Sequence, residues 1–296
     1  MEHTKQMNKT SGPGTLYLCA TPIGNLEDIT LRVLRILKEV DLIAAEDTRD
    51  SGKLLTHFQI DTPMTSYHEY NRIEKAEWLA DELLKGKNIA LITDAGTPGI
   101  SDPGEDLVRI CAERGIPVTS LPGAAACITA LTVSGLSTRR FAFEAFLPED
   151  KKARRRILKE LETETRTIIL YTAPHDIKGL LPELKEVLGE RRIAVCRELT
   201  KRYETILRTD LTGAVKHFEK EVPRGEFVLV IEGKDPEEIR RDEQEAWAQM
   251  SVAEHMRYYE EQGVSHKEAM KLVAKDRGVG KREIYSALLE SEESSF

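Results

Sequence analysis

Hydrophobic and polar residues alternate in two rhythms along the first two thirds of the chain. Short apolar runs rich in β-branched residues predict buried strands, while the segments between them carry apolar residues at helical spacing. In the first half of this region we predict strands over Leu16–Ala20, Leu42–Ala45, Ile89–Thr93 and Ile116–Leu121. Strands that alternate with helices in this way predict an α/β fold.

Helices are predicted between these strands. Apolar residues recur at helical spacing over 31–40, and a second helix around Leu79 and Leu83 ends at Gly86, a residue type that commonly follows a helix C-terminus. An Ala-rich apolar helix follows the fourth strand and runs to Leu131.

The pattern changes after a Ser-Gly-Leu-Ser-Thr connector at Ser134–Thr138, where we place a domain boundary. Few helices are evident beyond it, which predicts a mixed sheet. Its strands are predicted over Phe141–Phe146, Thr167–Tyr171, Ile193–Arg197, Glu204–Leu207 and Phe227–Glu232. We therefore expect an N-terminal α/β domain over residues 15–134 and a C-terminal α/β domain over residues 135–236.

The two ends of the chain are polar. Residues 1–14 lack the apolar centre of a signal peptide and are expected to form a disordered leader. A helical module is expected over residues 250–291, with helices at Met256–Gln262, Lys267–Asp276 and Lys281–Leu289. Two short helices around a tight turn resemble a helix-turn-helix, but a helical hairpin that packs on the body is an equally good interpretation.

The composition and charge of the chain exclude some classes of function. The chain has 296 residues, 40% of them hydrophobic, and a net charge of -8, so it is not a nonspecific nucleic-acid binder by overall charge. The four cysteines are widely spaced among apolar neighbours, which predicts small core residues of a reducing compartment. With no apolar run of roughly 20 residues, we expect a soluble, cytoplasmic protein without a membrane partner.

Glycine and proline gather directly after the predicted strands, in Thr21–Asn25, Asp94–Gly104 and Leu121–Ala125. Ligands of open α/β sheets bind at the carboxyl ends of strands, where such loops converge. An ordinary turn is the alternative for any single loop, but three Gly and two Pro in the eleven-residue segment Asp94–Gly104 favour a ligand site. No phosphate-binding signature such as GxxxxGK[ST] is present.

A family resemblance follows from eight strings that occur in order between Leu16 and Gly233. They are LYLCATPIGNLEDIT, DLIAAEDTR, DAGTPGISDPG, LPGAAACITAL, FEAFLP, YTAPH, RELTKRYE and GEFVLVIEG. The chain resembles the small-subunit ribosomal RNA methyltransferases of the tetrapyrrole methylase-like (class III) family. The resemblance implies two α/β domains with S-adenosyl-L-methionine (SAM) in the cleft between them, usually in a homodimer. It also implies methylation of the 2′-oxygen of a cytidine in the decoding centre of 16S rRNA.

The resemblance also implies cofactor contacts by motif. The Gly96-Thr97-Pro98 loop corresponds to a Gly-Asp-Pro loop of the family, with Thr97 in place of the acidic residue of the tetrapyrrole enzymes. The expected SAM-binding residues are Pro22, Gly96, Thr97, Pro98, Ile100, Ser101, Asp102, Gly123, Ala124, Ala125, Tyr171, Thr172, Ala173, Gly225 and Glu226.

A ribose hydroxyl is a weak nucleophile, so some group should accept its proton. We expect Glu46, Asp47 and Arg49 to line the substrate side of the cleft, although an ion-pair network that fixes a loop explains them at least as well. Further candidates are His68, Glu69, Glu198 and Lys201, each with a structural alternative. The seven histidines show no ligand-like spacing, so no metal site is expected.

RNA binding by an acidic protein requires a local basic patch. Such a patch is predicted from Arg139, Arg140, Lys151, Lys152, Arg154, Arg155 and Arg156. A solvated helix face is the default for such a charge run, and acidic residues follow it at Glu160, Glu162 and Glu164. We favour contact with the RNA of the small ribosomal subunit.

Two other functions are compatible with the pattern. One is a methyltransferase that acts on a precorrin-like tetrapyrrole, as in the wider class. The other is a nucleic-acid-binding regulator built around the terminal helices, although a regulator would not need the large cleft-forming body.

Overall fold

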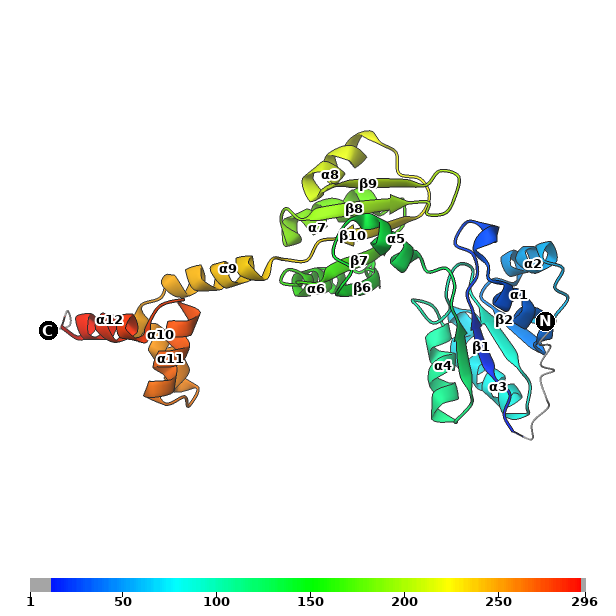
Figure 1. Cartoon of the computed structure of the whole chain (residues 1–296), viewed down its shortest axis with the longest axis horizontal. Coiled ribbons are helices and arrows are strands. Elements are labelled where there is room, and N and C mark those ends of the chain that lie inside the picture. Colours follow the sequence, from blue (N-terminus) through cyan, green and yellow to red (C-terminus); the bar gives the residue numbers. More distant parts are fainter. Residues whose placement is uncertain (1–11, 294–296) are drawn as a thin grey trace, which may run out of the picture. The chain divides into compact units, whose positions relative to one another are not determined.

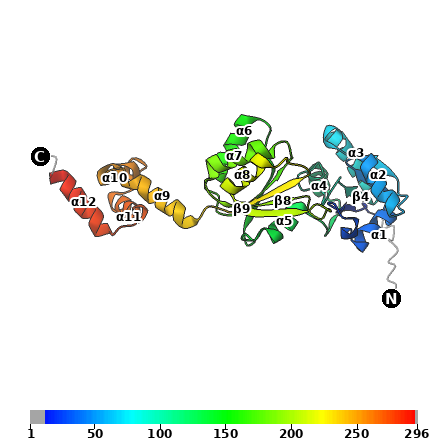
Figure 2. The ribbon, with the colours of Figure 1, turned by 90° about the horizontal axis from the view of Figure 1, so that it is seen from above.

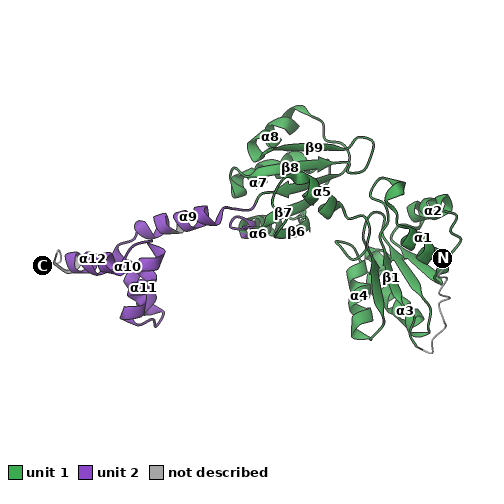
Figure 3. Cartoon of the chain, in the orientation of Figure 1, with its two compact units in different colours: residues 1–159, 166–232 green, residues 160–165, 233–296 purple. Residues whose placement is uncertain are grey.

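The computed structural model describes residues 12–293, which divide into two compact units (Figure 3). The first unit comprises the described residues through Lys159 together with Arg166–Glu232, and the second comprises Glu160–Thr165 and the residues from Gly233 onward. Most of the predicted leader, residues 1–11, lies outside the described part. The domain boundaries proposed from the sequence stay predictions.

The first sheet, which contains the strands labelled β1 and β2 in Figure 1, has five parallel strands. They pair in the order β3-β2-β4-β1-β5. Its strands are β1 (Leu16–Cys19), β2 (Leu42–Ala45), β3 (Met64–Ser66), β4 (Ile89–Ile92) and β5 (Val118–Leu121). Four of the five follow the predicted apolar runs, because strands buried on both faces need continuous apolar sequence. Parallel pairing brings all five carboxyl ends to one edge of the sheet.

Helices cover both faces of this sheet, which confirms the α/β prediction. Alternate strand residues such as Leu16 and Leu91 pack against α3 (Arg72–Leu84) and α4 (Gly104–Glu113). On the opposite face, Ile43 and Ile92 join the core formed with α1 (Leu31–Glu39) and α2 (Thr48–His57). Each fully buried Leu or Ile contributes about 1.5–3 kcal/mol from removal of apolar surface from water.

The second sheet is mixed, as predicted, with the order β6-β7-β10-β8-β9. The pairing of β6 with β7 is parallel, and the other three pairings are antiparallel. Its strands are β6 (Phe141–Phe146), β7 (Thr167–Thr172), β8 (Arg192–Arg197), β9 (Thr205–Asp210) and β10 (Phe227–Ile231). The expectation of few helices was wrong, however, because α6 (Lys151–Leu161), α7 (Ile177–Leu188) and α8 (Leu211–Lys220) lie between these strands.

One helix connects the two sheets through its packing. The Ala-rich helix α5 (Ala126–Ser134) follows β5 of the first sheet, yet its buried residues Ala130 and Leu131 pack against Ile169 and Val230 of the second sheet. Figure 2 shows α5 on one side of the second sheet and α6, α7 and α8 on the other.

The second unit contains α9 (Pro236–Ala248), α10 (Val252–Glu261), α11 (His266–Asp276) and α12 (Lys281–Glu293). The last three helices confirm the predicted helical stretches and share a core of Met256, Ala269, Val273 and Ile284. Every helix within residues 12–293 is too short or too polar to span a bilayer.

Candidate active site

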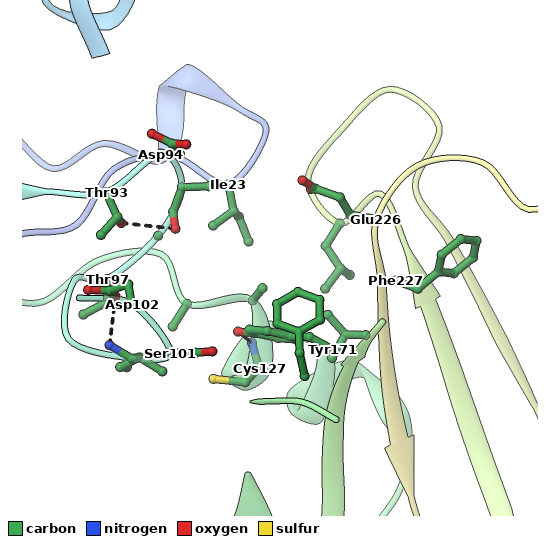
Figure 4. Close-up of a pocket in the computed structure, with 18 of the residues that line it drawn as sticks. Ile23, Thr93, Asp94, Thr97, Ser101, Asp102, Cys127, Tyr171, Glu226 and Phe227 are labelled. Atoms are coloured by element: carbon green, nitrogen blue, oxygen red, sulfur yellow. Dashed lines mark hydrogen bonds between the residues drawn. The ribbon is translucent and has the colours of Figure 1, made fainter. Parts of the chain in front are cut away.

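A cavity of about 520 Å³ lies in the first unit, at the carboxyl ends of β1, β2 and β4. Figure 4 shows Asp94, Thr97 and Asp102 on one side of this cavity and Tyr171, Glu226 and Phe227 on the other. The first group comes from loops of the first sheet, and the second group from strands and loops of the second sheet. The cavity therefore occupies the position where the Gly- and Pro-rich loops predict a ligand.

The loop after β4 is held in shape by its own side chains and by the loop after β1. Backbone hydrogen bonds join Thr21 and Gly96 in both directions, at 2.9 and 3.1 Å. The Asp102 carboxylate accepts N–H groups of Gly99, Ile100 and Gly104 at 2.8–3.0 Å. Gly96 has φ +89°, a conformation that glycine adopts without steric cost.

Most of the expected SAM-binding residues line the cavity. Those with lining positions are Gly96, Thr97, Ile100, Ser101, Asp102, Ala125, Tyr171, Thr172, Ala173 and Glu226. The expected residues that are not among the lining positions are Pro22, Pro98, Gly123, Ala124 and Gly225.

Two glycines outside the lining have packing roles. A Cβ on Gly123 would lie 2.4 Å from the Ala20 Cβ, so glycine allows the chain after β5 to approach the end of β1. A Cβ on Gly225, which has φ +82°, would lie 2.5 Å from the Glu198 carboxyl carbon. Both close approaches require glycine for packing, and the direct cofactor contacts that the sequence motif implied stay a prediction.

The apolar side of the cavity is built around Tyr171. Its hydroxyl accepts the Cys127 N–H at 3.1 Å, which links β7 to the first turn of α5. The rings of Phe143 and Phe146 contact Tyr171 edge-on, with centroids 5.0 and 5.4 Å away. This arrangement offers a rigid aromatic surface to a flat ligand group.

An ion cluster lies next to Glu226, on the same side of the cavity as Tyr171. The Lys201 ammonium donates to carboxylate oxygens of Glu198 and Glu226, both at 2.9 Å. Glu198 has φ +51°, an uncommon backbone conformation for a non-glycine residue. Glu198 and Lys201, two of the additional catalytic candidates, thus hold the strand-end loop that carries Glu226.

The three favoured catalytic candidates separate in the structure. Glu46 lines the cavity. Asp47 instead caps α2 by accepting the Arg49 N–H, and its carboxylate pairs with the Arg49 guanidinium at 2.7 Å. The hydrogen bonds from Arg49 lower the pKa of Asp47 far below its ordinary value. Asp47 and Arg49 therefore fit the ion-pair alternative, and neither is among the lining residues.

Burial raises the pKa of the Glu46 carboxyl, and the nearby negative charge of Asp94 raises it further. Asp102 and Glu69 add smaller contributions in the same direction, while a hydrogen bond from the Asp94 N–H opposes them. Glu69 thus acts on Glu46 through its charge. Neither His68 nor Glu69 is among the lining residues.

Several lining residues were missed as site residues. They are Ile23, Thr93, Asp94, Ala95, Ala126, Cys127, Phe146, Pro174, Cys196, Leu199, Phe227 and Val228. Asp94 was detectable, because it opens the Gly- and Pro-rich loop after β4. Cys127 and Cys196 are buried and free, which confirms the core prediction for these thiols, but the sequence carried no signal that they face the cavity.

The predicted basic residues lie at the start of α6 and before β6. Lys151, Lys152, Arg155 and Arg156 are exposed, as are Arg139 and Arg140. Arg154 differs, because its guanidinium pairs with Glu183 of α7 at 2.9 Å and its side chain is only 18% exposed.

Residues 15–214 match the sequence pattern of the tetrapyrrole (corrin/porphyrin) methylase family. The chain belongs to this methylase family. A uroporphyrin-III-C-methyltransferase from Thermus thermophilus has the same fold, with a TM-score of 0.54 at 20% identity over 73% of this chain and 94% of that one.

Closer relatives of this methylase share nearly their whole length with it. A protein of Halalkalibacterium halodurans named ribosomal RNA small subunit methyltransferase I is 47% identical, over 97% of this chain and 98% of the relative. A Bacillus subtilis protein of the same name is 46% identical, over 95% of this chain and 96% of the relative.

Proposed function

We propose that this methylase transfers a methyl group from SAM to the 2′-oxygen of a cytidine in the decoding centre of 16S rRNA. The observation that carries the proposal is the cavity at the strand ends, in a chain whose full-length relatives are named ribosomal RNA methyltransferases. The tetrapyrrole alternative is less favoured, because the likeness to the uroporphyrin enzyme extends to the fold alone at 20% identity.

The cavity fits SAM in size and chemistry. Its volume of about 520 Å³ lies within the usual range for small-molecule sites, about 300–1,000 Å³. Its charged lining residues are Glu46, Asp94, Asp102 and Glu226, and no lysine, arginine or histidine is among the described lining residues. An acidic lining suits a ligand that carries a positive sulfonium.

We assign the two sides of the cavity to two parts of the cofactor. The aromatic and apolar side around Tyr171 would hold the adenine, while the Gly96–Thr97 backbone and the adjacent acids would hold the polar methionine portion. SAM supplies a methyl group already activated by its sulfonium. The protein must then position the acceptor oxygen in line with that methyl group and exclude water.

We assign RNA contacts to Arg139, Arg140, Lys151, Lys152, Arg155 and Arg156, whose exposed side chains can reach phosphates. Arg154 is a weaker candidate because of its bond to Glu183. Removing one cation that neutralises a phosphate should reduce the slope of log affinity against log salt by roughly 0.7–0.9. We therefore expect Lys151→Gln/Lys152→Gln/Arg155→Gln to bind small subunits more weakly and with a flatter salt dependence. Unchanged binding would reject this surface.

The decisive experiment combines the purified chain, labelled SAM and small ribosomal subunits from a strain that lacks the endogenous modification. We expect label in 16S rRNA, and mass spectrometry of nuclease fragments should locate it on the ribose of one cytidine. Label on a base, or on a tetrapyrrole offered in parallel and not on RNA, would overturn the proposal. The homodimer and the cytoplasmic location remain predictions, and light scattering of the purified protein tests the first.

A further inference from the structure

Two carboxylates from neighbouring strand ends occupy the polar side of the cavity. Glu46 directly follows β2 and Asp94 lies just beyond β4, and these strands pair in parallel with Ala45 opposite Ile92. The Asp94 carboxylate accepts the Asp47 N–H at 3.0 Å, which ties the loop after β4 to the residue next to Glu46. The backbone therefore fixes the two acids in one corner of the site.

The other acids of the cavity are engaged elsewhere. Asp102 accepts backbone N–H groups of its own loop, and Glu226 pairs with Lys201. Burial raises the pKa of Cys196 to about 11, and burial likewise raises the pKa of Tyr171, so both groups keep their protons near pH 7. Of the four lining carboxylates, Glu46 is thus best placed to accept a proton, because the Asp94 carboxylate already accepts the Asp47 N–H.

We propose that Glu46 accepts the proton of the substrate hydroxyl during methyl transfer and that Asp94 is a positioning residue for Glu46. This assignment rests on the proposed function. As the hydroxyl oxygen bonds to the methyl carbon, its proton passes to a Glu46 oxygen and the methyl–sulfur bond breaks with its electron pair on sulfur. Glu46 then returns the proton to water.

Asp94 supports this role in two ways. Its hydrogen bond with the Asp47 N–H fixes the backbone that carries Glu46, and its negative charge disfavours a second negative charge on Glu46. A carboxylate accepts protons more effectively when its pKa lies closer to the working pH. The charged groups that act on Glu46 are Asp94, Asp102 and Glu69, and each of these acids raises its pKa. Because protonated Glu46 cannot act as a base, the reaction rate should fall as the pH drops through the Glu46 pKa.

The first test replaces the proposed base by its neutral isostere. Glu46→Gln should lower the single-turnover methylation rate by about 10²–10⁴-fold, while calorimetry should show unchanged SAM affinity. Glu113→Gln, at the exposed end of α4, is the matched control and should retain both. A Glu46→Gln variant as fast as the wild type would overturn the assignment.

The second test removes the charge of Asp94 but keeps an oxygen that can accept the Asp47 N–H. In Asp94→Asn, the acid limb of the rate–pH profile should move to lower pH, because the Glu46 pKa falls when its negative neighbour is lost. A ¹³C NMR titration of glutamate-labelled protein without cofactor should show the same shift for the Glu46 carboxyl. An unchanged Glu46 titration would overturn the positioning role.

The outcomes separate this assignment from the function on which it rests. Asp47→Asn should leave the position of the acid limb unchanged, even if the rate falls, because Asp47 is engaged with Arg49 at the start of α2. A wild-type chain that methylates small-subunit RNA, beside an equally active Glu46→Gln variant, refutes only the assignment. A wild type without this activity refutes the proposed function itself.

Discussion

Gly123 provides a direct test of whether a glycine of the cofactor motifs acts through packing. An added Cβ in Gly123→Ala would lie 2.4 Å from the Ala20 Cβ, whereas carbon atoms in contact prefer roughly 3.5–4.0 Å. The two residues follow β5 and β1, which are paired neighbours in the sheet, so the backbone must shift by about 1 Å to relieve the overlap. Overpacking of this kind costs about 1–3 kcal/mol.

A double-mutant cycle isolates this contact. Ala20→Gly removes the opposing methyl group, at a cost of about 0.8 kcal/mol for the buried group plus about 0.5–1 kcal/mol for the added backbone freedom. If the overlap is the cause, the double variant should lose no more stability than Ala20→Gly alone, so the coupling energy should be about 1–3 kcal/mol. Gly179→Ala is the control, because an added Cβ in α7 meets no atom within 4 Å and should stabilise the helix by up to about 1 kcal/mol.

Urea unfolding, followed by tryptophan fluorescence, measures these free energies. The two tryptophans lie in different units, Trp78 in α3 and Trp247 in α9. A Trp247→Phe background therefore restricts the signal to the first unit. Additive effects of Gly123→Ala and Ala20→Gly would refute the packing explanation. Loss of SAM binding in a stable double variant would instead favour a direct cofactor contact at Gly123.

Three further predictions concern the site and its surroundings. Asp102→Ala should reduce the affinity for SAM and lower the free energy of unfolding by about 1–3 kcal/mol, because three backbone N–H groups lose their acceptor. Calorimetry measures the affinity and urea titration the stability. An unaltered affinity would argue that the shape of this loop does not matter for binding. Tyr171→Phe should destabilise the first unit by about 1 kcal/mol through loss of the acceptor for the Cys127 N–H, and a neutral effect in urea would contradict that role. Folding lowers the pKa of Asp47, so the ionised Asp47 carboxylate should stabilise the fold above its unfolded pKa of about 3.9. This stabilisation should decline as the pH falls. If the wild type and an Asp47→Asn variant kept a constant difference in unfolding free energy between pH 6 and pH 3, this linkage would be disproved.

The strands of the first sheet were predictable because burial on both faces demands continuous apolar sequence. β2 was predicted with its observed bounds, Leu42–Ala45. The helix α2 was missed, because few of its residues are buried and its start is defined by the capping carboxylate of Asp47. The short strand β3 has only partly buried residues, so it carries little hydrophobic signal.

The position of the site was also predictable, but the identity of its contacts was less so. Glycine and proline mark the loop after β4 in the sequence, and that loop does line the cavity. Phe146 and Cys127 come from β6 and α5, whose orientation toward the cavity depends on how the second sheet packs. Three neighbouring residues, Glu46, Asp47 and Arg49, looked equivalent in sequence, and only the capping and ion-pair geometry at α2 distinguishes Glu46 from the other two.

The packing of α5 has a practical consequence for dissecting this protein into fragments. The helix follows the last strand of the first sheet, but Ala130 and Leu131 are buried against the second sheet. A fragment that ends at Ser134 would carry this apolar surface without its partner, which favours aggregation during expression. A split between Pro122 and Gly123 would leave α5 with the strands that cover it, so complementary halves divided there should be more soluble and should reassociate more readily.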